Sequence, residues 1–172
     1  MTKRLIIFSV LFFLLLVSTG FGQPKKIIID TDCGFDDLSS ISLFLSMPDV
    51  EVLAITSCGG NIDAETGYYK ICSLIETLND SAEFNFNYSK IFTGIDSKSG
   101  EKPSWREDEE KIIWGFGDYQ PEIIKSNETF EEIIENSGGE IYYICLGPFS
   151  NLKKVVKQNK NLIRKIKKVY WY

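Results

Sequence analysis

The part of this sequence best suited to chemistry is a cluster of four aspartates within eight residues. In the segment IIIDTDCGFDD they are Asp30, Asp32, Asp36 and Asp37, grouped around Gly34. At an effective dielectric near 20, two carboxylates about 5 Å apart repel each other by about 3 kcal/mol. A cation or a shared proton must offset this repulsion where several carboxylates converge. Crowded carboxylate oxygens suit calcium or magnesium, and calcium tolerates the crowding best.

The remaining composition argues against other metals and against histidine chemistry. The chain contains no histidine, and its four cysteines form no CxxC pair, so zinc, copper and iron are disfavoured. A histidine-dependent triad or a histidine general acid is excluded for this stretch as well. The cysteines are irregularly spaced, and three of them lie in apolar segments, which predicts small core residues rather than a disulfide framework.

Three alternative interpretations of the aspartates can be tested by counting. An EF-hand loop starting at Asp30 would need glycine at the sixth position and glutamate at the twelfth, where this chain has Phe35 and Ile41. The Asp-x-Asp pair after a strand resembles haloacid-dehalogenase-like phosphatases, which usually carry threonine or valine at the position of Gly34. Helix capping, for which Asp36 is placed, needs one carboxylate and not four.

Elements that position the cluster follow from the hydrophobic pattern. Strands are expected at 26–30, 50–57, 90–93, 140–146 and 168–172, and helices at 37–46, 64–78, 121–136, 149–157 and 162–167. The rest of 81–119 is assigned no element. This alternation predicts an α/β fold, a mostly parallel open sheet with helices on both faces and a Rossmann-like core, whose ligands bind at the carboxyl ends of the strands. Because the sequence ends on a strand, we expect 23–172 to be the N-terminal part of a longer domain.

The first 22 residues have the pattern of a secretory signal peptide. Lys3 and Arg4 precede an apolar run from Leu5 to Val17, and small residues follow. The mature chain would begin at Gln23, in the periplasm or outside the cell, with membrane contact only during export. The alternative is an uncleaved anchor of a membrane-tethered structural protein, but the run is shorter than the roughly 20 residues of a span.

Nucleic acid is not an expected partner. The formal charge is -5 and the only dense basic run, 153–168, has apolar residues at helical spacing. We interpret it as a solvated helix face.

The segment from Asp30 to Asp37 resembles the hallmark DTDxGxDD of the inosine-uridine-preferring nucleoside hydrolase family. The resemblance continues through PDVEVLAIT at 48–56, Gly60-Asn61, and LGPFSN at 146–151. It spans about 26–172, strongly at both ends and weakly between 81 and 136. It implies the fold of these hydrolases and an exported enzyme that acts on small-molecule nucleosides, with a homo-oligomer as a possibility.

The resemblance also implies roles for individual residues. Asp32 would bind calcium and act as general base on water, while Asp37 and the backbone carbonyl of Leu146 would bind the same ion. Asp36 and Asn61 would hold the ribose hydroxyls.

Asp30 would support the loop from beneath.

The reaction implied is hydrolysis of the N-glycosidic bond of ribonucleosides to base and ribose, through an oxocarbenium-like state.

Further family residues lie beyond the last position of this chain. They are the last calcium-binding aspartate, other ribose contacts and the histidine that assists the leaving base in many members. The alternatives are therefore a noncatalytic relative that binds nucleosides or sugars, or an inactive fragment.

Overall fold

The computed structural model describes residues 22–81, 84–96, 104–112, 126 and 128–172. In chain order the elements are β1 (Lys25–Thr31), α2 (Phe35–Ser46), β2 (Val50–Ser57), α3 (Ala64–Ser81), the 3₁₀ helix η1 (Tyr88–Lys90), β3 (Ile91–Thr93), α4 (Trp105–Lys111), α5 (Phe130–Asn136), β4 (Ile141–Cys145), α6 (Ser150–Gln158), the 3₁₀ helix η2 (Lys160–Lys165) and β5 (Ile166–Trp171).

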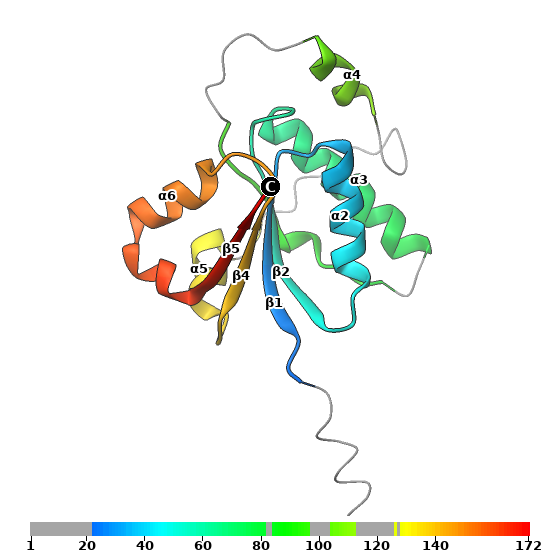
Figure 1. Cartoon of the computed structure of the whole chain (residues 1–172). Helices are drawn as coiled ribbons and strands as arrows, with labels where there is room; N and C mark the ends of the chain where they lie inside the picture. Colours follow the sequence, from blue (N-terminus) through cyan, green and yellow to red (C-terminus); the bar gives the residue numbers. More distant parts are fainter. Residues whose placement is uncertain (1–21, 82–83, 97–103, 113–125, 127) are drawn as a thin grey trace, which may run out of the picture.

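The five strands form one parallel sheet in the order β3-β2-β1-β4-β5 (Figure 1). In this order β1 is the central strand, with β2 on one side and β4 on the other. The loops that follow β1, β2 and β4 therefore meet at one edge of the sheet, where ligands bind in open α/β folds. The predicted α/β fold with a parallel sheet is confirmed.

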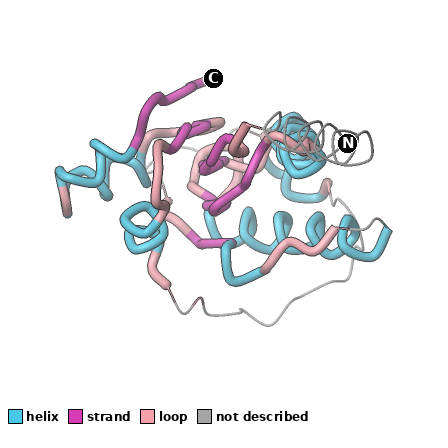
Figure 2. Tube along the Cα trace, turned by 90° about the horizontal axis from the view of Figure 1, so that it is seen from below, coloured by secondary structure: helices cyan, strands magenta, loops and turns pink. Residues whose placement is uncertain are grey.

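Helices cover both faces of this sheet (Figure 2). Side chains alternate along β1, so that Ile27 and Ile29 pack into one core with α2 and α3. Ile28 faces the opposite way and packs into a second core with α5 and α6. Because a strand that is buried on both faces carries apolar side chains on both, it appears in the sequence as an unbroken apolar run.

Two of the expected helices differ from those observed. The helix expected over 121–136 begins only at Phe130. Positions 126, 128 and 129 before it are not helical, and 121–125 lie outside the described residues. The reason is local: Thr129 accepts a hydrogen bond from the backbone of Glu132, whose carboxylate accepts one from the backbone of Thr129. In place of the helix expected over 162–167 the chain forms the 3₁₀ helix η2, which lies two residues earlier, and β5 starts at Ile166.

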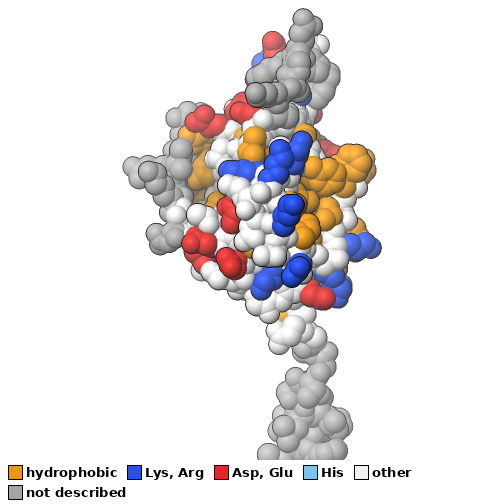
Figure 3. Space-filling model, turned by 90° about the vertical axis from the view of Figure 1, so that its left-hand side faces the viewer, with side chains coloured by type: hydrophobic (Ala, Val, Ile, Leu, Met, Phe, Trp, Pro, Cys, Tyr) orange, Lys and Arg blue, Asp and Glu red, His pale blue; other side chains and the backbone are white. Residues whose placement is uncertain are grey.

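The basic run at 153–168 is distributed over α6, η2 and β5, and its lysines are mostly exposed. Lysine and arginine side chains are spread over this face, with apolar side chains beside them (Figure 3). The expectation that these charges are solvated is confirmed, although they do not belong to one helix.

All four cysteines are buried and free, including the three in apolar segments that were expected to be core residues. The segment expected to be a signal peptide lies outside the described residues, except for Gly22. Within the described ranges, no helix is long and apolar enough to cross a membrane.

Candidate active site

The acidic loop connects the buried end of β1 to the first turn of α2. Cys33 has a φ of 62°, a left-handed conformation, and its N–H donates to the Thr31 hydroxyl at 2.9 Å. This turn places Gly34 at the N-cap of α2, where no side chain caps the helix. Asp36 and Asp37 lie in the first helical turn. Capping therefore does not account for the aspartates.

Asp32 and Asp37 face each other at the base of this loop. The two carboxyl groups are hydrogen-bonded to each other, which requires a shared proton in the absence of a cation. Burial raises the pKa of Asp32, and it raises the pKa of Asp37 to about 7 with a further contribution from the charge on Asp32. Each of the two carboxyl groups also accepts a hydrogen bond from a residue outside the pair. Thr31 Oγ1 donates to Asp37 Oδ2 at 2.6 Å, and the Asn61 N–H donates to Asp32 Oδ2 at 3.0 Å.

Two glycines from neighbouring strand ends enclose the Asp32 side chain. A β-carbon added to Gly60, after β2, would lie 2.2 Å from Asp32 Oδ2. One added to Gly147, after β4, would lie 3.0 Å from the β-carbon of Asp32. The side chain therefore occupies a space that only glycines leave open, and its position is set by three strand ends at once.

Asp36 and Asn61 also come together, against Gly34. A β-carbon on Gly34 would lie 2.9 Å from Asp36 Oδ1 and 3.0 Å from Asn61 Nδ2. Asp36 is exposed, and Asn61 is partly exposed. A carboxylate and an amide side by side can accept from and donate to the two hydroxyls of a sugar diol.

These side chains line one cavity of about 530 Å³. Its lining is Asp32, Gly34, Asp36, Asp37, Gly60, Asn61, Arg106, Glu109, Leu146, Pro148 and Tyr172. The structure thus brings together every predicted catalytic, ribose-binding and metal-binding residue. Arg106 and Glu109 of α4 are additional members that the sequence did not reveal.

The donor types around this cavity fit calcium, but the donor number is small. Asp32 and Asp37 supply carboxylate oxygens, and Leu146, whose carbonyl is the expected third donor, also lines the cavity. Across the described residues, no group of three or more Asp, Glu, Cys or His side chains is close enough to hold a metal ion. Calcium takes six to eight oxygens, so other oxygens, such as those of water and sugar hydroxyls, would have to complete its shell here.

Asp30 does not reach the cavity and is fully buried beneath the loop. Tyr143 Oη donates to its Oδ2 at 2.7 Å, and Asn151 Nδ2 donates to its Oδ1 at 2.9 Å. Burial raises the pKa of Asp30 to about 6, although both of these bonds act in the opposite direction. The position agrees with the expected supporting role.

Asn151 connects this network to the rest of the sheet edge. Its side-chain amide also donates to the carbonyl of Ser57 at 2.9 Å, and its Oδ1 accepts from the N–H of Ile95 at 2.9 Å. These contacts are those of a structural residue. One buried amide thus joins the ends of β1 and β2 and the segment after β3.

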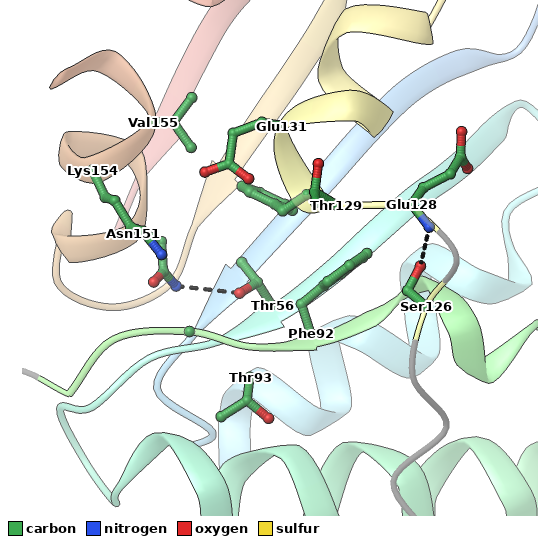
Figure 4. Close-up of a pocket in the computed structure, with 12 residues that line it drawn as sticks. Thr56, Phe92, Thr93, Ser126, Glu128, Thr129, Glu131, Asn151, Lys154 and Val155 are labelled. Carbon is green, nitrogen blue, oxygen red and sulfur yellow. Dashed lines mark hydrogen bonds between the residues drawn. The ribbon is translucent and has the colours of Figure 1, made fainter. Parts of the chain in front are cut away.

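A second cavity of about 410 Å³ lies on the other side of Asn151, between β3, α5 and α6 (Figure 4). Phe92, Glu131, Lys154 and Val155 are among its lining residues, together with Thr56, which accepts a hydrogen bond from Asn151. None of the loop aspartates lines it. The larger, acidic cavity is therefore the candidate active site.

Sequence reasoning missed Tyr143 and Arg106. Tyr143 belongs to an apolar strand, and only the pairing of Asp30 with Cys145 in the sheet brings its hydroxyl to Asp30. Arg106 lies in a charged helix whose place over the loop depends on tertiary packing. Neither residue belongs to a motif that would have identified it.

Comparisons with known proteins agree with this geometry. The family model described as inosine-uridine preferring nucleoside hydrolase matches residues 27–172. Uridine nucleosidase 1 of Arabidopsis thaliana is 26% identical over 165 residues, covering 86% of this chain and 44% of that protein. The chain thus spans about half the length of the curated relatives it matches.

Solved structures give the same result. An inosine-guanosine nucleoside hydrolase superposes with a TM-score of 0.57 at 27% identity, over 83% of this chain and 44% of that one. A purine-preferring ribonucleoside hydrolase from Gardnerella vaginalis reaches a TM-score of 0.66 at 23% identity, over 86% of this chain and 48% of that one. The second likeness concerns the fold alone.

Proposed function

Because this chain belongs to the inosine-uridine preferring nucleoside hydrolase family, we propose that the protein hydrolyses the N-glycosidic bond of ribonucleosides to base and ribose, with calcium as cofactor. The observation that carries the proposal is the acidic cavity in which Asp32, Asp37 and Leu146 lie beside Asp36 and Asn61. Its oxygens are of the kinds that hold a divalent cation and a sugar diol next to each other.

In this proposal Asp32, Asp37 and the carbonyl of Leu146 hold the calcium ion. When bound, calcium would neutralise the facing carboxylates and lower the pKa of a water molecule in the site. Asp32 takes the proton from the attacking water, and the Asn61 N–H, which donates to its Oδ2, holds the carboxylate in place for this task.

Asp36 and Asn61 bind the ribose hydroxyls and so fix the anomeric carbon relative to that water. The water oxygen bonds to the anomeric carbon as the bond to the base nitrogen breaks. The sugar passes through an oxocarbenium-like state, whose positive charge the nearby carboxylates stabilise.

The proposal is tested by measuring the ribose that is released from a nucleoside by the protein as the cell produces it. We expect reducing sugar to appear from inosine or uridine with calcium present, and to disappear in a chelator. Asp32→Ala should abolish turnover, whereas Asp49→Ala, an exposed aspartate before β2, should not change it. Full activity of the Asp32 variant would refute the general-base assignment.

A noncatalytic nucleoside binder is the second outcome of the same experiment. It would bind inosine or uridine with calcium-dependent affinity and release no ribose. Calorimetry with each nucleoside, in calcium and in chelator, separates binding from turnover.

We also propose that residues 1–22 direct export and are then removed. N-terminal sequencing of the natural protein should start at Gln23. A start at Met1 would refute cleavage.

A further inference from the structure

The acidic cavity contains one positively charged side chain among the described residues that line it, Arg106 of α4. Glu109 also lines the cavity, one helical turn further along the same face of α4. Figure 1 shows α4 beyond the carboxyl ends of the strands, above the loop that carries the aspartates. The cavity thus has the aspartates on the side of the sheet and an arginine on the side of α4.

A buried lysine fixes α4 in this place. Lys70, in the middle of α3, is 6% exposed, and its ammonium group donates to the backbone carbonyl of Glu109. Burial lowers the pKa of Lys70, while the charges of the α4 residues Glu109 and Glu110 act in the opposite direction. One side chain therefore connects α3 to α4, and this contact lies three residues from Arg106.

Breaking an N-glycosidic bond leaves the bonding electron pair on the base nitrogen. That charge must be neutralised by a proton or stabilised by a donor. Among the described side chains that line the cavity, Arg106 is the one that carries a positive charge. Arginine does not give up its proton in proteins, but its five N–H donors carry a full charge and bind anionic or carbonyl acceptors.

We propose that Arg106 stabilises the negative charge that develops on the departing base. This inference rests on the proposed function, because it concerns the same bond cleavage. The water adds its hydroxyl to the anomeric carbon and its proton passes to Asp32. The base leaves with the electron pair and takes a proton from solvent after Arg106 has stabilised its charge.

The alternative is that Arg106 only offsets the repulsion among the loop aspartates. That role would be structural and would affect every substrate equally. If Arg106 assists departure of the leaving group, its loss should slow a substrate only to the extent that this leaving group needs its negative charge stabilised. The two explanations therefore differ in how an Arg106 variant treats a good and a poor leaving group.

The test compares two substrates in the protein as the cell produces it, with calcium present. One is whichever of inosine and uridine the wild type hydrolyses faster. The other is 4-nitrophenyl β-D-ribofuranoside, whose phenolate leaves readily without a charged donor. Arg106→Gln should lower kcat/KM for the nucleoside about 100-fold, the usual effect of removing one preorganised donor. For the nitrophenyl riboside the loss should be less than about 10-fold.

Two variants serve as controls. Arg106→Lys keeps the charge and should restore part of the nucleoside activity. Arg164→Gln makes the same exchange at an exposed position of η2 and should behave as the wild type.

Each contrary result overturns the inference. An equal loss on both substrates would mean that Arg106 supports the site structurally, and no loss on either would mean that it does not contribute. A wild type that hydrolyses the nitrophenyl riboside but neither nucleoside would refute the leaving-base role and leave the glycosidase chemistry standing. A wild type that hydrolyses none of these compounds would refute the proposed function itself.

Discussion

Replacing Gly60 with alanine should damage the candidate site while leaving the fold intact. The added β-carbon would lie 2.2 Å from Asp32 Oδ2 and 2.7 Å from the Asp32 β-carbon. Because non-bonded atoms rest at about 3.5 Å, the carboxylate must move by about 1 Å. That movement breaks the hydrogen bond from the Asn61 N–H and turns Asp32 away from Asp37.

A displacement of about 1 Å in a positioned catalytic group costs about 100-fold in rate. We therefore expect Gly60→Ala to lower kcat for nucleoside hydrolysis by about that factor. The affinity for calcium, measured by calorimetry, should fall by about 10- to 100-fold, which is about 1.4 to 2.8 kcal/mol. Urea unfolding in a chelator should show a loss of about 1 to 3 kcal/mol, because the Asp32 β-carbon can move away only together with its backbone.

Gly139→Ala is the matched control, because nothing lies within 4 Å of a β-carbon added there. It should leave calcium affinity, kcat and stability at the values of the wild type. If Gly60→Ala binds calcium and turns over substrate like the control, then Asp32 is not held as the structure indicates. The assignment of Asp32 to both metal and water would then be wrong.

Three further predictions concern the buried carboxyls and one helix end. Tyr143→Phe removes a donor from the buried Asp30 and should lower the free energy of unfolding in urea at pH 7 by about 1 to 3 kcal/mol; an unchanged value would mean that the bond at 2.7 Å contributes nothing net. Since burial raises the pKa of Asp37 to about 7, the folded chain without calcium binds this proton more tightly than the unfolded chain does. The Tm of the wild type minus that of Asp37→Asn, both measured in chelator, should therefore fall as pH rises from about 4 to about 7. A difference that rises with pH would contradict this prediction. Thr129→Ala removes the capping hydrogen bond of α5 and should cost about 1 kcal/mol in urea unfolding. Ser104→Ala, at the N-cap of α4 where the side chain makes no capping hydrogen bond, should cause no change.

The order of strands and helices could be predicted because each buried strand is a short apolar run followed by turn residues. The bounds of β2, Val50–Ser57, coincide with the expected ones for this reason. The acidic loop could be assigned for a different reason: its spacing is local, so strand, turn and helix place the aspartates without distant contacts. Prediction failed at α5, where the capping box of Thr129 and Glu132 was present in the sequence but the acidic pattern before it was taken as helix.

The other parts of the site depend on contacts between distant segments. Asn61 and Leu146 were found by resemblance, and only the sheet order brings them to the same loop. Tyr143 and Arg106 were not found, because a tyrosine in an apolar strand and an arginine in a charged helix are common in any protein. Their roles appear only when Asp30 and the cavity are seen beside them.

The central position of β1 has a consequence for the folding kinetics of the chain. Its partner β4 comes late in the sequence, and Asp30 and Tyr143, which meet across this pair, are 113 positions apart. Closing so long a loop is slow, so the pairing of β1 with β4 should form late in folding. Until β4 docks, the loop lacks Gly147 and Leu146 and is incomplete. A ligand that needs the complete loop should therefore slow unfolding and leave the folding rate almost unchanged.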